Sequence, residues 1–308
     1  MKNMNTKDIF SILPQNIKTI LSSITNLNDL QEIRIRAERP LMVEVDNKEI
    51  EFRYCPSIAD LRSIVQRMSN YSIYAFEEEI KQGYLTINGG HRIGLCGTCI
   101  MEHGKVKTIK NIASINIRVC KAVTGCSSNI IPYIQSQGNI INSIIISPPK
   151  CGKTTLIRDI TRLISNGYNN LKGKKVCVID ERSEIGACYN GIPQLDIGRR
   201  TDVLDGCLKS YGIMMAVRSM APDVIVCDEI GTYKDVESIL MALNCGVNLI
   251  ATIHGYGIED LFDRAVFKEL IDNKVFQRAI VLSCLKGAGT VEYIYDFTKM
   301  QFLWRRQI

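Results

Sequence analysis

Nine residues near the middle of the chain, Ser147–Thr155, combine glycine, lysine and hydroxyl side chains at a spacing that could hold a chain of phosphates. The stretch reads SPPKCGKTT and directly follows a short run of isoleucines. Phosphate-binding loops carry the pattern G-x-x-x-x-G-K-[ST] between a strand and a helix. Gly152, Lys153 and Thr154 match this pattern, whereas Ser147 stands in the place of its first glycine. In such a loop the backbone N–H groups surround the phosphates, and the helix N-terminus adds positive potential.

The residue types in this loop predict a site for ATP and Mg²⁺. The ammonium group of Lys153 would meet the β- and γ-phosphates, and the hydroxyl group of Thr154 would bind Mg²⁺. The alternative is an ordinary strand–turn–helix that contains GKT by chance. The residues expected to line the nucleotide are Ser147, Pro148, Pro149, Lys150, Cys151, Gly152, Lys153, Thr154 and Thr155.

Two acidic groups follow apolar, strand-like runs further along the chain. The sequence DERSE, Asp180–Glu184, ends the first run, and Asp228 and Glu229 end the second, which reads PDVIVC. An aspartate at such a place can belong to the shell of a Mg²⁺ ion, and a carboxylate beside it can orient and deprotonate water. Taken singly, each group could equally be ordinary charge at the end of a strand.

A histidine and several arginines could complete the same site. The run LIATIHG ends in Thr252 and His254, while Arg199, Arg200 and Arg218 lie between the two acidic groups in the chain. A lone histidine is usually structural and single arginines are usually solvated. Because open α/β sheets bind ligands beyond the carboxyl ends of their strands, we expect these groups to converge on one crevice.

The elements that must position these groups form two predicted domains, residues 1–120 and 121–308. The first mixes helical patterns with short alternating strands, and residues 30–45 alternate like a half-buried hairpin. In the second, nearly continuous apolar runs (INSIIIS, KKVCVID, DVIVCDE, VNLIATI and RAIVLSC) alternate with helical stretches. This pattern is typical of buried parallel strands. We therefore expect an α/β domain, with a parallel sheet covered on both faces, after a smaller α+β domain.

Composition narrows the class of protein. The chain has 308 residues, of which 46% are hydrophobic and 23% charged, and a formal net charge of +6. No apolar run approaches the roughly 18 residues that span a bilayer, and the N-terminus lacks the apolar core of a signal peptide. We therefore expect a cytoplasmic protein. The mild charge and the lack of a basic block do not favour nucleic acid as a partner.

The twelve cysteines are scattered through the apparent core strands, which predicts reduced thiols that behave as small hydrophobic residues. One pair, Cys96 and Cys99, has the spacing of a zinc or dithiol site, with His91 and His103 nearby. No second CxxC accompanies it, so two core cysteines on a glycine-rich strand is the favoured interpretation.

The order of these motifs resembles that of the secretion ATPase superfamily, which drives type II and type IV secretion and pilus assembly. Between about residues 30 and 255, the stretches EIRIRAERPL, YAFEEEIKQGYLTINGGHRIGLCGT, IASINIRV, RRTDVLDGC and MMAVRSMAPDVIVCDEIG are similar to the stage III sporulation protein AA family. The resemblance implies a RecA-like P-loop ATPase domain of the additional-strand catalytic-glutamate type. It also implies a hexamer in the mother cell of an endospore former. There the protein would power a secretion-like channel to the forespore, with a membrane protein of that channel as its partner.

The resemblance also implies roles for single residues. Lys153 and Thr154 would contact phosphate and Mg²⁺, Glu229 would be the catalytic carboxylate, and His254 would sense the γ-phosphate. Glu181 and Glu184 match the acidic box of the family. The residues with an implied catalytic role are Glu229, Glu184 and His254, and those with an implied place around the metal are Thr154, Asp228 and Glu181.

Two loop positions depart from the family pattern. Ser147 replaces the leading glycine, and Lys150 stands where a loop glycine is common. If Lys150 adopts a positive φ, the strain is about 1–3 kcal/mol, and its positive charge near the phosphates would offset part of that strain. We therefore expect a working nucleotide site that these departures weaken.

Arginines of the first domain are candidates for completing the site, because secretion ATPases use basic residues of their N-terminal domain in this way. Arg92 in GGHRIGL and Arg118 in SINIRV lie in strands with mostly apolar neighbours. Each either faces solvent or points into a cleft between the domains. Arg34 and Arg36 are weaker candidates, because they alternate on one face of an exposed-looking strand.

Three other functions fit parts of the sequence. A P-loop kinase would need an arginine-rich lid, and no such lid is evident. A nucleotide-gated scaffold would bind ATP for assembly and hydrolyse little of it. A nucleic-acid motor would need basic patches rich in aromatic residues, which this sequence lacks.

Overall fold

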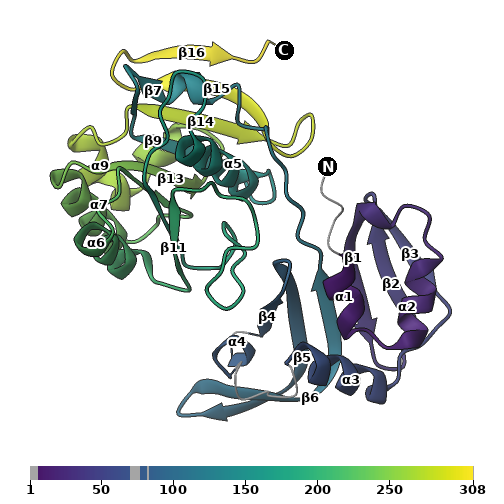
Figure 1. The fold of residues 1–308 in the computed structure, drawn as a ribbon. Coiled ribbons are helices and arrows are strands. Elements are labelled where there is room, and N and C mark those ends of the chain that lie inside the picture. Colours follow the sequence, from purple (N-terminus) through teal and green to yellow (C-terminus); the bar gives the residue numbers. More distant parts are fainter. Residues whose placement is uncertain (1–5, 70–76, 82, 308) are drawn as a thin grey trace. The chain divides into compact units, whose positions relative to one another are not determined.

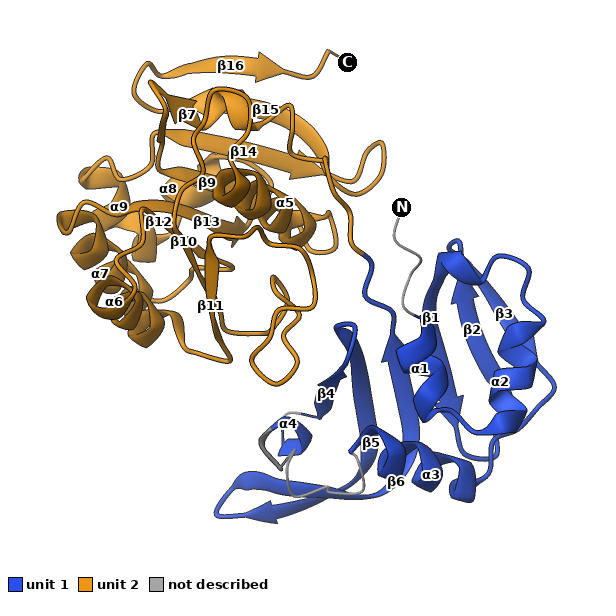
Figure 2. Cartoon of the chain, viewed as in Figure 1, with its two compact units in different colours: residues 1–121 blue, residues 122–308 orange. Residues whose placement is uncertain are grey.

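The structure, a computed structural model, describes residues 6–69, 77–81 and 83–307. It divides into two compact units, residues 1–121 and 122–308 (Figure 2). Residues 74–76 and 82, which belong to one of the stretches that carry the family resemblance, lie outside the described residues. Among the described helices, none has the length and apolar character needed to cross a bilayer.

The first unit is an antiparallel sheet with short helices (Figure 1). Its strand order is β3-β2-β1-β6-β5-β4. The predicted hairpin over residues 30–45 is confirmed as β1 and β2, which pair antiparallel. The strands are β1 (Leu30–Arg36), β2 (Leu41–Val45), β3 (Lys48–Phe52), β4 (Tyr84–Ile87), β5 (His91–Glu102) and β6 (Lys105–Arg118); the helices are α1 (Thr6–Ile12), α2 (Gln15–Ser22), α3 (Ile58–Met68) and α4 (Glu77–Lys81), with a 3₁₀ turn η1 (Leu27–Asp29).

Helix α3 shows how the local sequence sets an element in this unit. The Ser57 hydroxyl accepts a hydrogen bond from the Asp60 N–H, and the Asp60 carboxylate accepts one from the Ser57 N–H, which closes a capping box. Leu61, Ile64 and Met68 follow at helical spacing and are buried. The polar start therefore fixes where the helix begins, and the apolar stripe fixes the face that it buries.

The second unit contains an eight-stranded sheet, whose strand order is β11-β10-β12-β13-β9-β14-β15-β16. The first six strands in this order are parallel, and β15 and β16 continue the sheet antiparallel. The strands are β9 (Ser143–Ser147), β10 (Val176–Asp180), β11 (Thr201–Asp205), β12 (Val224–Cys227), β13 (Asn248–His254), β14 (Arg278–Ser283), β15 (Thr290–Asp296) and β16 (Gln301–Arg305), and a small separate hairpin joins β7 (Gln135–Ser136) to β8 (Asn139–Ile140).

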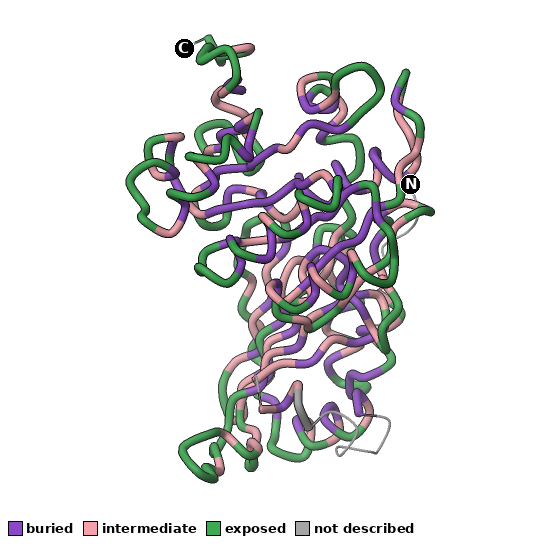
Figure 3. Tube along the Cα trace, turned by 90° about the vertical axis from the view of Figure 1, so that its left-hand side faces the viewer, coloured by how far each residue is buried: buried purple, intermediate pink, exposed green. Residues whose placement is uncertain are grey.

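Helices cover both faces of this sheet, as the alternation of the strand side chains requires (Figure 1). In β9, Ile144 and Ile146 pack in one core with residues of α6 and α7, while Ile145 packs in a second core with residues of α5. Burial follows the central strands in Figure 3. The helices are α5 (Lys153–Asn166), α6 (Lys209–Ser219), α7 (Tyr233–Asn244), α8 (Glu259–Asp263) and α9 (Lys268–Asp272), with 3₁₀ turns η3 (Ile131–Tyr133) and η4 (Ala265–Phe267).

The predicted α/β fold, with a largely parallel sheet after a smaller α+β unit, is thus observed. This fold determines where the predicted site residues lie. Strands β9, β10, β12 and β13 are parallel members of one sheet, so Ser147, Asp180, Asp228 and His254 lie at or just beyond the same edge.

Candidate active site

The loop between β9 and α5 has the backbone shape of a tight turn. Ser147 is fully buried at the end of β9, and its hydroxyl donates to the Pro148 carbonyl at 2.9 Å. Lys150 has φ 63° and Gly152 has φ 83°, both in the left-handed region. A Cβ atom on residue 152 would lie 2.8 Å from the backbone nitrogen of Gly289, so only glycine fits there. Helix α5 begins at the next residue, Lys153.

Lys153, Glu229 and His254 meet at the strand ends. The buried ammonium group of Lys153 donates to Oε1 of Glu229 at 2.9 Å and lies 3.5 Å from both ring nitrogens of His254. Nε2 of His254 is 2.8 Å from the same carboxylate oxygen. Burial favours the neutral carboxyl of Glu229, but Lys153, His254 and Arg182 together outweigh it and hold the pKa of Glu229 below its usual value. Glu229 is therefore an ionised carboxylate at neutral pH.

A second contact joins the start of α5 to the end of β12. The Thr154 hydroxyl donates to Oδ2 of Asp228 at 3.1 Å. The Thr252 hydroxyl donates to the other oxygen of Asp228 and accepts the Glu229 N–H at 2.9 Å. A hydroxyl next to a carboxylate fits Mg²⁺, which commonly takes few ligands from protein and the remainder from phosphate and water. Among the described residues, no group of three or more His, Cys, Asp or Glu side chains could hold a metal alone.

The acidic box is held by Asp180 at the end of β10. Its carboxylate accepts the N–H groups of Glu184 at 2.9 Å, Ile185 at 2.9 Å and Gly186 at 2.8 Å. Burial raises the pKa of Asp180, and the three N–H donors act in the opposite direction. Arg158 of α5 donates to the carbonyl oxygens of Ile185, at 2.6 Å, and Glu184. The box is thus anchored to the helix that follows the phosphate loop.

Glu181 and Glu184, the two glutamates predicted in the acidic box, have other contacts than Asp228, which bonds Thr154. The Glu181 carboxylate pairs with Lys209 of α6. Glu184 is anchored by its backbone, as described above. Their predicted roles at the metal and in catalysis therefore remain predictions.

Arg182 is a site residue that the sequence reasoning missed. Its guanidinium group donates to Oε2 of Glu229, opposite the oxygen that Lys153 and His254 contact. Arg182 lies inside the acidic box, whose carboxylates are the residues that suggest chemistry. No sequence pattern pairs Arg182 with Glu229, which lies 47 positions further along the chain.

Arg182 leads to a prediction about pH. In Arg182→Gln we expect the pKa of Glu229 to rise, because a cation that favours the ionised form is gone while burial continues to oppose it. A base with a higher pKa loses its charge earlier as the pH falls, so the acid limb of kcat/KM should move to higher pH. Full pH–rate profiles of wild type and variant measure this shift, with Arg199→Gln as the control. Superimposable acid limbs would contradict it.

The expectation that Arg199, Arg200 and Arg218 converge on this crevice is wrong. Arg200 donates to the Ser165 carbonyl at 3.0 Å, near the C-terminal end of α5, and directly precedes β11. The Arg199 N–H donates to Asn166 at 3.0 Å. Residues that lead into a parallel strand lie at its amino end, so both arginines are at the edge of the sheet away from the loop. Arg218, in the last turn of α6 before β12, lies at that edge as well.

The cysteines differ from expectation in two ways. Cys96 and Cys99 are exposed free thiols of β5, not core residues, and no metal-binding cluster forms within the described part of the chain. The expectation that the cysteines are all reduced is wrong for one pair, since Cys151 of the loop and Cys284, directly after β14, are joined by a disulfide.

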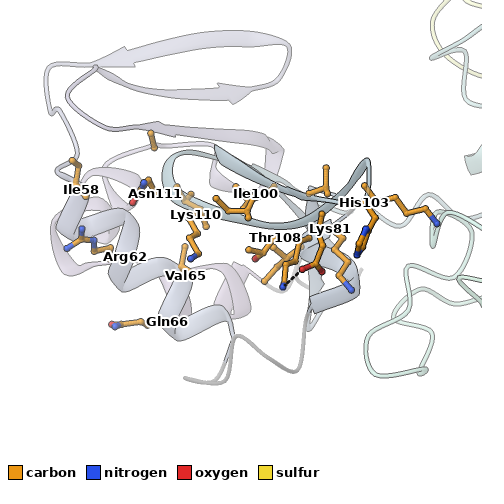
Figure 4. A pocket seen from close by; sticks show the side chains of 18 residues that line it. Ile58, Arg62, Val65, Gln66, Lys81, Ile100, His103, Thr108, Lys110 and Asn111 are labelled. Carbon is orange, nitrogen blue, oxygen red and sulfur yellow. Dashed lines mark hydrogen bonds and ion pairs between the residues drawn. The ribbon is translucent and has the colours of Figure 1, made fainter.

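Arg92 and Arg118 of the first unit face each other across β5 and β6 as directly paired positions. The Arg92 guanidinium lies 3.6 Å above the ring centre of Tyr84, and Arg118 is exposed. The same unit also holds a cavity bounded by α3, α4 and the long β5–β6 hairpin (Figure 4). His103, named above beside the Cys96 and Cys99 pair, lines it, whereas none of the residues predicted to bind ATP or Mg²⁺ or to act in catalysis does.

Lys150, which stands where the family commonly has a loop glycine, allows a test of whether this difference affects ATP binding. The residue already has its left-handed φ in the structure, so strain at this position is not an added cost of binding. We therefore expect Lys150→Gly to weaken ATP binding through the lost positive charge, with the larger loss at low salt. Lys150→Gln, which keeps the Cβ atom but not the charge, should weaken binding equally. Calorimetric titration of both variants measures this, and tighter binding by the glycine variant would mean that strain dominates.

Comparison of the sequence with known proteins shows the family to which the chain belongs. Residues 3–301 match the family described as "Sporulation stage III, protein AA". Stage III sporulation protein AA of Bacillus subtilis (strain 168) is 44% identical over 291 residues, which cover 94% of each chain. The uncharacterised protein ycf45 of Porphyra purpurea is 29% identical over 266 residues, which are 85% of this chain and 43% of that protein.

Solved structures show the same fold. The ATPase DotB of Legionella pneumophila aligns with a TM-score of 0.61 and 17% identity, covering 92% of this chain and 81% of its own. The pilus retraction motor PilT, solved with bound ADP, aligns with a TM-score of 0.58 and 16% identity, covering 86% of this chain and 76% of its own.

Proposed function

The chain belongs to the stage III sporulation protein AA family, and we propose that it is a Mg²⁺-dependent ATP hydrolase of the secretion-ATPase type. The observation that carries the proposal is the meeting of Lys153, Glu229 and His254, with Thr154 and Asp228 in contact beside them. A phosphate loop, a metal-binding pair and an ionised carboxylate are the parts that hydrolysis of a phosphate anhydride requires.

The chain's own residues divide the work as follows. The loop amides and Lys153 would bind and orient the β- and γ-phosphates, and Thr154 and Asp228 would hold Mg²⁺, which neutralises phosphate charge. Thr252 fixes the Asp228 carboxylate by a hydrogen bond. Glu229 would orient the attacking water and accept its proton, because it is ionised and lies one residue beyond Asp228.

The wider role rests on the relatives. The relative from Bacillus subtilis is named a stage III sporulation protein, and DotB is described as an ATPase. We propose that this chain acts as a hexamer in the cytoplasm of the mother cell. It would lie peripheral to the membrane through a membrane-protein partner and power assembly of, or transport through, the channel to the forespore.

The test is an ATPase assay and a mass measurement on one sample of the full chain, with and without ATP and with and without Mg²⁺. We expect phosphate release that requires Mg²⁺ and a higher mass when nucleotide is present. Nucleotide-dependent assembly without phosphate release would favour the scaffold, and transfer of phosphate to an added small molecule would favour the kinase. Failure to bind nucleotide at all would contradict the proposal.

Arg92 and Arg118 carry a separate prediction within this function. An arginine that meets the transition-state charge contributes roughly 10³–10⁵ in rate, in cis or in trans. We expect Arg118→Ala or Arg92→Ala to lose hydrolysis, and each to regain part of it when mixed with the Lys153→Ala variant, if the contact crosses subunits. Arg53→Ala, which changes an exposed arginine directly after β3 that was not a candidate, is the control. Full activity of both variants, or of an isolated 121–308 fragment, would refute the role.

A further inference from the structure

The disulfide between Cys151 and Cys284 joins two segments separated by 133 residues of sequence. Cys151 is the residue before Gly152 in the phosphate loop, and Cys284 directly follows β14. Their Cα atoms are 5.2 Å apart. This distance lies within the range of about 4.4–6.8 Å that is usual for disulfides, so the two backbone segments are close enough for the bond.

The turn between β14 and β15, residues 284–289, also holds the phosphate loop without the disulfide. The Gly289 N–H donates to the Cys151 carbonyl at 2.9 Å. Gly152 packs so closely on Gly289 that a Cβ atom on residue 152 would lie 2.8 Å from the Gly289 nitrogen. Sγ of Cys284 lies 3.7 Å from the Lys150 carbonyl. Gly289 thus holds the loop at Cys151 and Gly152 by its own contacts, and the disulfide adds a covalent link between Cys151 and Cys284.

We propose that Cys151 and Cys284 form a reversible modification site, whose oxidation lowers the affinity of the phosphate loop for nucleotide. The inference rests on the proposed function of that loop. Binding requires Lys153, two residues after Cys151, to exchange Glu229 and His254 for phosphate oxygens. A loop tied covalently at Cys151 reaches that arrangement less often than a free one.

The chemistry is thiol–disulfide exchange with a low-molecular-weight disulfide. The exposed Cys284 thiolate attacks one sulfur of that disulfide and releases one thiol, which leaves a mixed disulfide on Cys284. The Cys151 thiolate then attacks the Cys284 sulfur and releases the second thiol. Two protein thiols are oxidised, one small disulfide is reduced to two thiols, and the protons of the protein thiols pass to the released thiolates. A small dithiol reverses both steps.

Accessibility separates Cys284 from the core cysteines, whereas its partner Cys151 is buried. Cys284 is exposed, so the first attack needs no opening of the fold. Burial raises the pKa of Cys177 to about 12, which keeps this core cysteine as an unreactive thiol. In a reducing cytosol, disulfides of mesophilic proteins are usually transient and redox-sensing, as this proposal requires.

The experiment uses the full chain after treatment with oxidised glutathione or with dithiothreitol. Peptide mapping by mass spectrometry reports the Cys151–Cys284 linkage, and calorimetry reports the affinity for Mg–ADP. If oxidation leaves a tenth of the loops competent, the dissociation constant rises about tenfold in the oxidised sample. Cys284→Ser, which keeps Cys151 in the loop, should bind Mg–ADP equally after both treatments. Thermal melting of this variant checks that it is folded.

The outcomes separate the two proposals. A linkage that forms while affinity stays equal, or becomes tighter, overturns the modification site and leaves the proposed function standing. Failure of oxidised glutathione to form the linkage overturns the modification site as well. Absence of Mg–ADP binding in both samples overturns the proposed function, and the modification site falls with it.

Discussion

Lys153→Ala should nearly abolish ATP hydrolysis and weaken nucleotide binding. The buried ammonium group is the charge that would face the β- and γ-phosphates, and in the structure it already bonds the predicted base, Glu229. Removing a single group that stabilises transition-state charge commonly costs roughly 10²–10³ in kcat, and this one also serves ground-state binding. Steady-state phosphate release and calorimetric binding of Mg–ADP measure the two effects separately.

The control for this variant is Lys172→Ala, which removes an exposed lysine of the same unit and should leave both quantities unchanged. Lys153→Ala also takes one cation away from Glu229, although Arg182 and His254 remain beside that carboxylate. Circular dichroism should therefore show a folded variant. A folded Lys153→Ala protein with near-normal hydrolysis would show that the loop is not the phosphate site.

Buried elements were predictable because their patterns are unambiguous. The run Ser143–Ser147 is buried at every position, and its centre of three consecutive isoleucines is typical of a central parallel strand. Strands β11, β15 and β16 escaped prediction because much of each is half-buried or exposed, so polar residues interrupt the apolar pattern.

The error over Arg199 and Arg200 follows from the missed strand β11. A parallel strand that follows β10 must start at the same edge as β10, so the chain between them has to return to the amino ends. Residues directly before β11 are therefore carried away from the loop. When β11 is not recognised, Arg199 and Arg200 are expected near the acidic box because they follow it in the sequence.

Contacts between loops escaped prediction for a different reason. Arg182 reaches Glu229 because Asp180 fixes the turn of the acidic box through three N–H donors, and such a turn has no sequence pattern of its own. The Cys151–Cys284 pair joins segments that only the β9–β14 pairing brings together. Strand patterns thus predict which ends share an edge, whereas the contacts among their loops require the structure.

Glu229→Gln should separate binding from hydrolysis. Glutamine has the same shape as glutamate, and its carbonyl oxygen can still accept the Lys153 hydrogen bond, so the phosphate loop keeps its position. Glutamine cannot accept a proton from water. A general base contributes typically about 10²–10⁴ in rate, so we expect kcat to fall by that factor with little change in Mg–ATP affinity. Single-turnover hydrolysis and calorimetry on the same preparation measure both quantities.

Two comparisons decide what a result for Glu229→Gln means. Glu237→Gln changes an exposed glutamate of α7 in the same way and should behave as wild type. Normal turnover by Glu229→Gln would place the base elsewhere, with Glu184 as the next candidate, and Glu184→Gln should then lose kcat instead. If Glu229→Gln is slow only because binding is lost, the carboxylate supports the loop through Lys153 and is not the base. We expect slow hydrolysis with intact binding. The cations around Glu229 keep its carboxylate ionised at neutral pH, and an ionised carboxylate can accept a proton from water.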